Sequence, residues 1–327
     1  MSRSGATTPT GMLGWLQREM AAARTEIRQG RFQRSMAVLA AGAAAVSGFE
    51  TYMQHLRGAF RNRWMWTPIW LTPPMTAAAA AAVFSEKAAR KVLPVVSVVT
   101  LLDGAIGFYH HVRGIQRMPG GFKLGQYNIV MGPPIFAPLL VCIVGVMGTL
   151  AALLRREQIE VFESGPAAVP AKLRTVADPA RLPELSESLP QEIAHGRFQQ
   201  GMALLSAIFA VLAGGEAYFE HLRGSFNQRW MWTPVWVTPP MVVAGAGAMR
   251  SKQMAHRVLP VMSAVTFLDG MLGFLLHLRG IKRMPGHFSN LQFNITMGPP
   301  LLAPLLFCAV GLLGFIASLM RREEGHL

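Results

Sequence analysis

The chain is poor in acidic residues and in charged residues of any kind. Only 15 % of its 327 residues are charged, and 31 Lys and Arg face 17 Asp and Glu. Soluble globular proteins carry about 25 % charged residues. This low share, together with 51 % apolar residues, excludes a disordered chain and an ordinary cytosolic enzyme. The sequence consists instead of long uncharged stretches separated by short basic ones, which is typical of a polytopic membrane protein.

Cysteine is equally scarce, and known catalytic patterns are missing. Cys142 and Cys308 lie in apolar stretches, so we interpret them as small packing residues and predict no disulfide framework. The first residues show no apolar core with a small-residue cleavage site, so we expect no secretory signal peptide. No nucleotide-binding loop, serine nucleophile elbow, C-x-x-C-H or H-E-x-x-H pattern occurs. We therefore predict no catalytic constellation, and the sequence leaves open whether the chain is an enzyme.

What the sequence does contain is an internal duplication. The tetrapeptide at 30–33 recurs at 196–199, and the same shift of 166 residues aligns the two copies without a gap as far as Glu157 and Glu323. Both copies keep the blocks RWMWTP, LDG-x-x-GF, RGI-x-RMPG and N-I-x-MGPP-x-x-AP. A shorter pattern, H-x-R-G, occurs twice in each copy. Because the copies act as an alignment inside one chain, residues that both retain are candidates for structure or function.

Each copy offers four apolar stretches of about the 20 residues that cross a bilayer. An even number of spans gives both copies the same orientation and places a pseudo-twofold axis along the membrane normal. We therefore predict an all-α integral membrane protein with eight transmembrane helices, built as two tandem four-helix repeats. The predicted spans are 34–56, 66–85, 92–112, 128–154, 200–222, 232–250, 258–278 and 294–320. The predicted units are an N-terminal interfacial segment (1–29), repeat 1 (30–157), a linker (158–195), repeat 2 (196–323) and a C-terminal tail (324–327).

Basic residues and helix-end residues predict the orientation of the spans. More Lys and Arg lie on the side of the termini, which predicts cytoplasmic termini in a bacterial-type inner or plasma membrane. The Pro-Pro pairs predict that the second and fourth span of each repeat start on the opposite side, and Pro138 and Pro304 predict kinks. The glycine after each conserved arginine predicts a left-handed helix end. These glycines are Gly58, Gly114, Gly224 and Gly280.

Histidine and arginine residues lie at the ends of alternate predicted spans, on the membrane side opposite the chain termini. Neutral imidazole is the commonest metal ligand, and b-type haem takes histidine pairs from facing helices. We interpret the four histidines as haem or metal ligands, with the arginines neutralising haem propionates. A quinone head group held by a histidine and an acid is the other cofactor that we consider. The candidate cofactor-binding residues are His55, Arg57, His111, Arg113, His221, Arg223, His277 and Arg279, and the candidate metal ligands among them are His55, His111, His221 and His277.

Four acids lie inside the predicted spans, at a depth where an unpaired carboxylate is costly. They are Glu50, Asp103, Glu216 and Asp269. Such intramembrane acids are functional candidates, and they suit a proton or cation path. A purely structural role, in which they join the histidines and arginines in cross-linking helix ends, is the alternative.

Three functions therefore compete. The first is a membrane subunit of an oxidoreductase or respiratory electron-transfer complex that binds haem b or quinone near one membrane face. The second is a proton- or ion-coupled transporter or channel that uses the four acids. The third is a cofactor-free structural subunit. The expected partners are membrane lipids and other protein subunits at the basic face, and not nucleic acid, because the basic residues border apolar spans.

Overall fold

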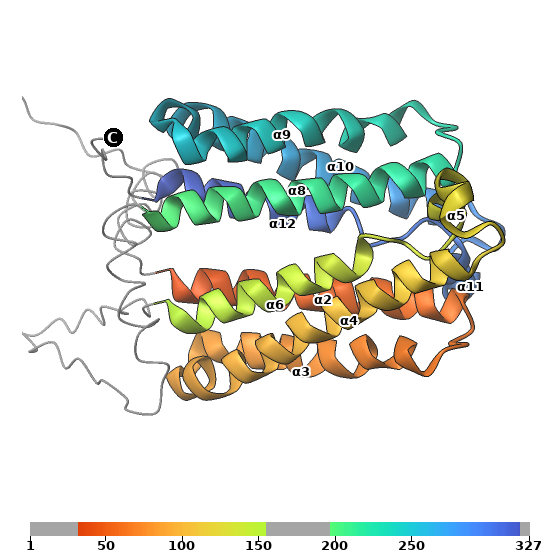
Figure 1. Cartoon of the computed structure of the whole chain (residues 1–327), viewed down its shortest axis with the longest axis horizontal. Helices are drawn as coiled ribbons and strands as arrows, with labels where there is room; N and C mark the ends of the chain where they lie inside the picture. Colours follow the sequence, from red (N-terminus) through yellow and green to blue (C-terminus); the bar gives the residue numbers. More distant parts are fainter. Residues whose placement is uncertain (1–31, 155–196, 321–327) are drawn as a thin grey trace, which may run out of the picture.

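The computed structural model describes residues 32–154 and 197–320, and the regular elements within these ranges are all helices. Figure 1 shows the long helices side by side, with the short helices α5 and α11 together at one end of the bundle. The described ranges begin and end at the opposite end. The predicted interfacial segment 1–29, the linker 158–195 and the tail 324–327 lie outside the described residues.

Four helices are long and apolar enough to cross a membrane, judged by length and composition: Gln33–Arg57, Ala88–Arg117, Phe198–Arg223 and Met254–Arg283. Two shorter apolar helices, Ala137–Leu153 and Leu305–Leu319, pack among them. These features are typical of an integral membrane protein.

The elements of the second half follow those of the first in the same order. In the first half they are α2 (Gln33–Arg57), η1 (Arg63–Trp66), α3 (Thr67–Phe84), the π-helical turn η2 (Ala88–Val92), α4 (Leu93–Arg117), η3 (Gly121–Leu124), α5 (Gly125–Met131) and α6 (Ala137–Leu153). In the second half they are α8 (Arg197–Arg223), η4 (Arg229–Trp232), α9 (Thr233–Arg250), the π-helical turn η5 (Met254–Val258), α10 (Leu259–Arg283), η6 (His287–Asn290), α11 (Leu291–Met297) and α12 (Leu305–Leu319).

The fourth predicted span of each half is broken, so the prediction of one kinked helix is wrong. Residues 132–136 separate α5 from α6, and residues 298–304 separate α11 from α12. A Gly-Pro-Pro sequence begins each break, and proline both lacks an N–H and disfavours helix at the residue before it. Pro138 and Pro304 do not kink a helix, because they lie at the very start of α6 and α12.

Two other local predictions are also wrong. α3 starts at Thr67 with Pro68 in its first turn, so Pro73 and Pro74 lie inside the helix instead of marking its start. None of the four predicted glycines is left-handed: Gly58 has a φ of −78°, Gly224 has no positive φ either, and Gly114 and Gly280 lie inside α4 and α10. After α2, Ala59 and Phe60 adopt the positive φ values instead. Gly114 serves close packing, because a Cβ there would lie 3.0 Å from Pro133 Cγ.

Small residues allow the helix backbones to approach closely. A Cβ at Gly145 of α6 would lie 2.6 Å from the backbone nitrogen of Leu101 on α4, and a Cβ at Gly311 of α12 would lie 2.5 Å from the carbonyl oxygen of Ser263 on α10. Close backbone approach is a principal source of helix–helix attraction where lipid replaces water. These contacts hold α6 against α4 and α12 against α10.

Candidate functional site

Each helix break is held by charged side chains from the other half of the chain. In the break between α11 and α12, the N–H of Leu302 donates to the Glu50 carboxylate at 2.5 Å. Arg57, seven residues after Glu50 on α2, donates to the carbonyl oxygens of Thr296 at 2.9 Å and Gly298 at 2.7 Å. Two side chains of the first half thus satisfy backbone groups that the break has released from helical bonding.

The reverse arrangement holds the break between α5 and α6. The N–H of Phe136 donates to the Glu216 carboxylate at 2.8 Å, and Arg223 donates to the carbonyl oxygens of Val130 at 2.7 Å and Gly132 at 2.8 Å. Unpaired backbone groups at membrane depth are costly, and a carboxylate is favoured at a helix N-terminus. The retention of Glu50, Arg57, Glu216 and Arg223 in both copies is therefore explained by helix capping.

The two intramembrane aspartates have a different role. Asp269 on α10 lies beside the side chain of Thr233, the first residue of α9, and Asp103 lies in the same way beside Thr67. The Thr233 hydroxyl also lies 3.1 Å from the carbonyl oxygen of Trp230. Each aspartate thus joins the middle of one long helix to the N-terminus of its neighbour.

All four predicted histidines use Nδ1 in the same way. Each Nδ1 lies 2.6 Å from a backbone carbonyl oxygen: His55 from Met65, His111 from Pro134, His221 from Met231 and His277 from Pro300. A carbonyl oxygen only accepts, so Nδ1 carries the proton and donates it. The neutral ring then presents Nε2 as a lone pair, with its orientation fixed by the carbonyl. Metal-binding histidines are commonly held in this way.

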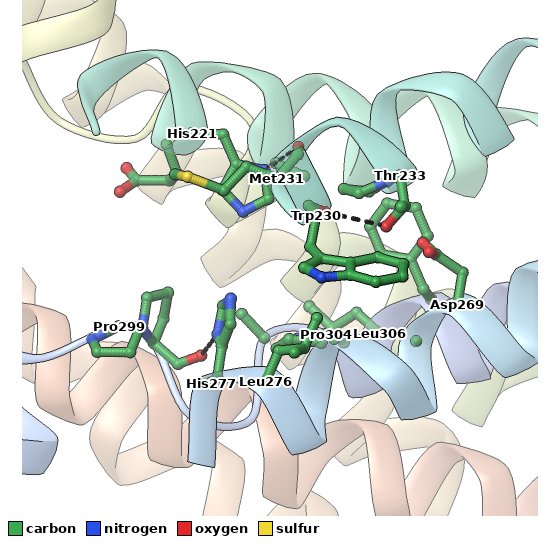
Figure 2. A pocket seen from close by; sticks show the side chains of 18 of the residues that line it. His221, Trp230, Met231, Thr233, Asp269, Leu276, His277, Pro299, Pro304 and Leu306 are labelled. Atoms are coloured by element: carbon green, nitrogen blue, oxygen red, sulfur yellow. Dashed lines mark hydrogen bonds between the residues drawn. The ribbon is translucent and has the colours of Figure 1, made fainter. Parts of the chain in front are cut away.

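A cavity of about 430 Å³ lies in the second half, between α8, the start of α9, α10 and the break before α12. Figure 2 shows His221 and His277 facing one another across it, with Trp230 next to them and Asp269 farther along the cavity, beside Thr233. The ring centroids of the two histidines are 6.4 Å apart, and their planes are inclined at 68°. The cavity volume falls in the range of sites for small molecules and cofactors, about 300–1,000 Å³.

The structure does not bring the four histidines together. Among the described residues, no group of three or more His, Cys, Asp and Glu side chains is placed to hold a metal ion. His221 instead pairs with His277 in the second half, and His111 lies within electrostatic range of His55 in the first. The sequence interpretation left open two haems or one metal ion with two ligands from each half, and the second-half histidines are the two whose rings lie close together.

The arginines of the four H-x-R-G patterns also differ in role. Arg57 and Arg223 are engaged by the helix breaks. Arg113 donates to the Tyr109 hydroxyl at 2.9 Å. In the second half the residue that corresponds to Tyr109 is Leu275, and within the described part of the chain the Arg279 side chain has no hydrogen-bond partner. Arg279 is therefore the arginine of this set that remains available for an anionic group.

The second-half cavity also contains residues that the sequence prediction missed. Trp230 and Leu276 line it. Their counterparts in the first half are Trp64 and His110, whose rings are stacked with centroids 5.0 Å apart. Glu220 lines it too and pairs with Arg223 at 2.9 Å. The retained RWMWTP block pointed to Trp230, but Leu276 and Glu220 are not shared by both copies and gave no such signal.

This chain matches no protein-family model, no curated protein and no solved structure.

Proposed function

We propose that the chain is an integral membrane protein with eight spans, arranged as two tandem four-helix repeats about a pseudo-twofold axis along the membrane normal. In this arrangement α3 and α9 cross the membrane, and the broken pairs α5–α6 and α11–α12 complete the set. The matching order of elements in the two halves supports the proposal. The excess of Lys and Arg on the terminal side supports cytoplasmic termini in a bacterial-type inner or plasma membrane.

Within this framework, the chain is a membrane subunit for electron transfer that binds haem b between His221 and His277. The distance between these two rings carries the proposal. A metal–nitrogen bond is about 2.0–2.1 Å long, so one metal ion bound by both Nε2 atoms places the two ring centroids about 6 Å apart. The observed separation is 6.4 Å.

The number of ligands favours haem over a bare metal ion. Only two histidines converge on this point, and no third ligand joins them among the described residues. A bare transition-metal ion takes about four ligands, whereas a haem iron brings four nitrogens of its own and needs one or two axial ligands.

The histidine tautomer disfavours the quinone alternative. With the proton on Nδ1 and donated to a backbone carbonyl, a neutral Nε2 accepts hydrogen bonds and donates none. A quinone carbonyl needs a donor. The two carbonyl oxygens of a quinone also lie on opposite sides of its ring, so two histidines that bound both of them would stand farther apart than 6.4 Å.

The end of the bundle that carries α5 and α11 is strongly basic and suits an acidic partner subunit or anionic lipid head groups. Its exposed cations have no exposed acid among them in the described residues, because Glu220 is paired with Arg223. An electron-donating protein with an acidic surface would dock here, near the proposed haem. The exposed cations are Arg57, Arg61, Arg63, Arg113, Arg117, Lys123, Arg229, Arg279, Lys282 and Arg283.

The haem proposal predicts a coloured protein. The full chain, expressed with an adequate haem supply and purified in detergent, should show a b-type α band in a dithionite-reduced minus air-oxidised spectrum. Iron analysis should give about one iron per chain. A well-folded, colourless protein with no iron contradicts haem binding and favours the transport or scaffold functions.

A transporter remains the second candidate, because the paired helix breaks favour it. Discontinuous helices at matching positions of two repeats are common where transporters bind their substrates. If this is the function, the protein in liposomes moves protons or cations, and Asp269→Asn, which alters an acid of the cavity, slows the flux at least tenfold. Asp103→Asn is the matched variant in the first half. Liposomes no leakier than empty ones contradict this candidate.

A further inference from the structure

We infer that each half of the chain positions the histidine site of the other half. Glu50 and Arg57, both from the first half, are positioning residues for the site that contains His277. Glu216 and Arg223, both from the second half, are positioning residues for His111. The break between α11 and α12 contributes directly to the second-half cavity.

The break orients His277 and forms a wall of the cavity. Its Pro300 carbonyl oxygen accepts the hydrogen bond from His277 Nδ1 at 2.6 Å, and Pro299, Ala303 and Pro304 line the cavity. A segment without regular helical hydrogen bonds has no internal ladder to fix its backbone. The orientation of the His277 ring therefore depends on what holds residues 298–304.

The groups that hold this segment come from α2 of the first half. Arg57 binds the carbonyl oxygens of Thr296 and Gly298 before Pro300, and Glu50 binds the N–H of Leu302 after it. Pro300 is thus bracketed by side-chain hydrogen bonds from the opposite half. Those from the Arg57 guanidinium have a charged donor, and such bonds are about twice as strong as neutral ones.

The same construction occurs in the other direction. The Pro134 carbonyl oxygen holds His111 Nδ1 at 2.6 Å. Arg223 binds the backbone before Pro134, at Val130 and Gly132, and Glu216 binds the N–H of Phe136 after it. Each half therefore provides the side chains that hold the helix break of the other half. Substitution of these side chains in one half should alter the histidine site of the other.

Hydrogen–deuterium exchange of the full chain in lipid nanodiscs tests whether each half holds the helix break of the other. The measurement needs no cofactor. Glu50→Ala should accelerate amide exchange in the peptide that covers 298–304 by about tenfold or more, through loss of a side-chain hydrogen bond. The peptide that covers 132–136 should stay unchanged. Glu216→Ala is the matched variant and should give the opposite pattern. Acceleration confined to the half that carries the substitution, or equal in both breaks, overturns the inference.

A second readout concerns the cofactor and rests on the proposed haem function. In haem-loaded protein, Glu50→Ala should change the electron paramagnetic resonance g values of the ferric haem, because they depend on the orientation of the axial rings. Glu50→Gln, which keeps an acceptor oxygen of similar size, should retain more of the native signal and also serves if the alanine variant fails to fold. Unchanged g values in both variants contradict a positioning role for Glu50. If the wild-type chain proves colourless, the haem proposal fails, while the exchange pattern still decides this inference.

Discussion

His277→Ala should abolish the b-type absorption band of the purified protein, and His221→Ala should do the same. Each substitution removes one of the two imidazole rings that line the second-half cavity with their centroids 6.4 Å apart. With one axial ligand left and no third ligand group among the described residues, haem retention should fall at least tenfold. The measurement is the reduced-minus-oxidised spectrum per mole of protein, alongside the thermal unfolding midpoint.

His256→Ala is the control for this experiment. His256 lies in η5, and its Nδ1 is 3.2 Å from the carbonyl oxygen of Ser318, away from the cavity. This variant should keep the full absorption band. If His55→Ala or His111→Ala removed the band while His277→Ala kept it, the haem would belong to the first half and our assignment would be wrong.

Gly311→Ala should destabilise the protein by about 1–3 kcal/mol, the usual cost of overpacking a tight contact. A Cβ at this position would lie 2.5 Å from the carbonyl oxygen of Ser263 and 2.8 Å from the backbone nitrogen of Phe267. Both are backbone atoms of α10, so relief requires α12 to move away from it. The measurement is the thermal unfolding midpoint in detergent, followed by the loss of helical circular dichroism.

Gly201→Ala is the matched control, since it adds the same methyl group to a helix of the same half. No atom lies within 4 Å of the Cβ position there, so the variant should unfold at the wild-type temperature or slightly above. Equal destabilisation by both variants would show that the close contact between α10 and α12 does not limit stability.

The sequence predicted the long helices well because hydrophobic length alone determines them. The predicted span 34–56 corresponds to α2 at Gln33–Arg57, and 232–250 corresponds to α9 at Thr233–Arg250. Hydropathy does not detect a helix break inside an apolar stretch, so 294–320 was expected to be continuous. The Gly-Pro-Pro sequence was visible there, but proline is equally common at a helix start and the pattern alone does not separate the two cases.

The candidate site was predictable only in part. Placing His221 and His277 at a similar depth needed no more than helix geometry. Their convergence on one cavity, and the separation of the four histidines into pairs, depend on how distant helices pack. The sequence also could not predict the partner of Glu50, because Leu302 contributes only its backbone N–H. Any residue except proline could have supplied that group.

The hydrogen bonds between the two halves are reciprocal, as they are across the interface of a symmetric dimer. In a twofold homodimer, a residue that contacts a second residue across the interface is matched by the reverse contact. Here Glu50 reaches Leu302, and Glu216 reaches Phe136, which corresponds to Leu302 in the first copy. Two copies of a single half could form the same bonds without a covalent link. In the single chain, loss of Glu50 affects the break between α11 and α12, and loss of Glu216 affects the break between α5 and α6. Each loss therefore affects the other half of the chain. Divergence between the halves is therefore less restricted at Leu276, which lines one cavity, than at the glutamates and arginines that hold the helix break of the other half.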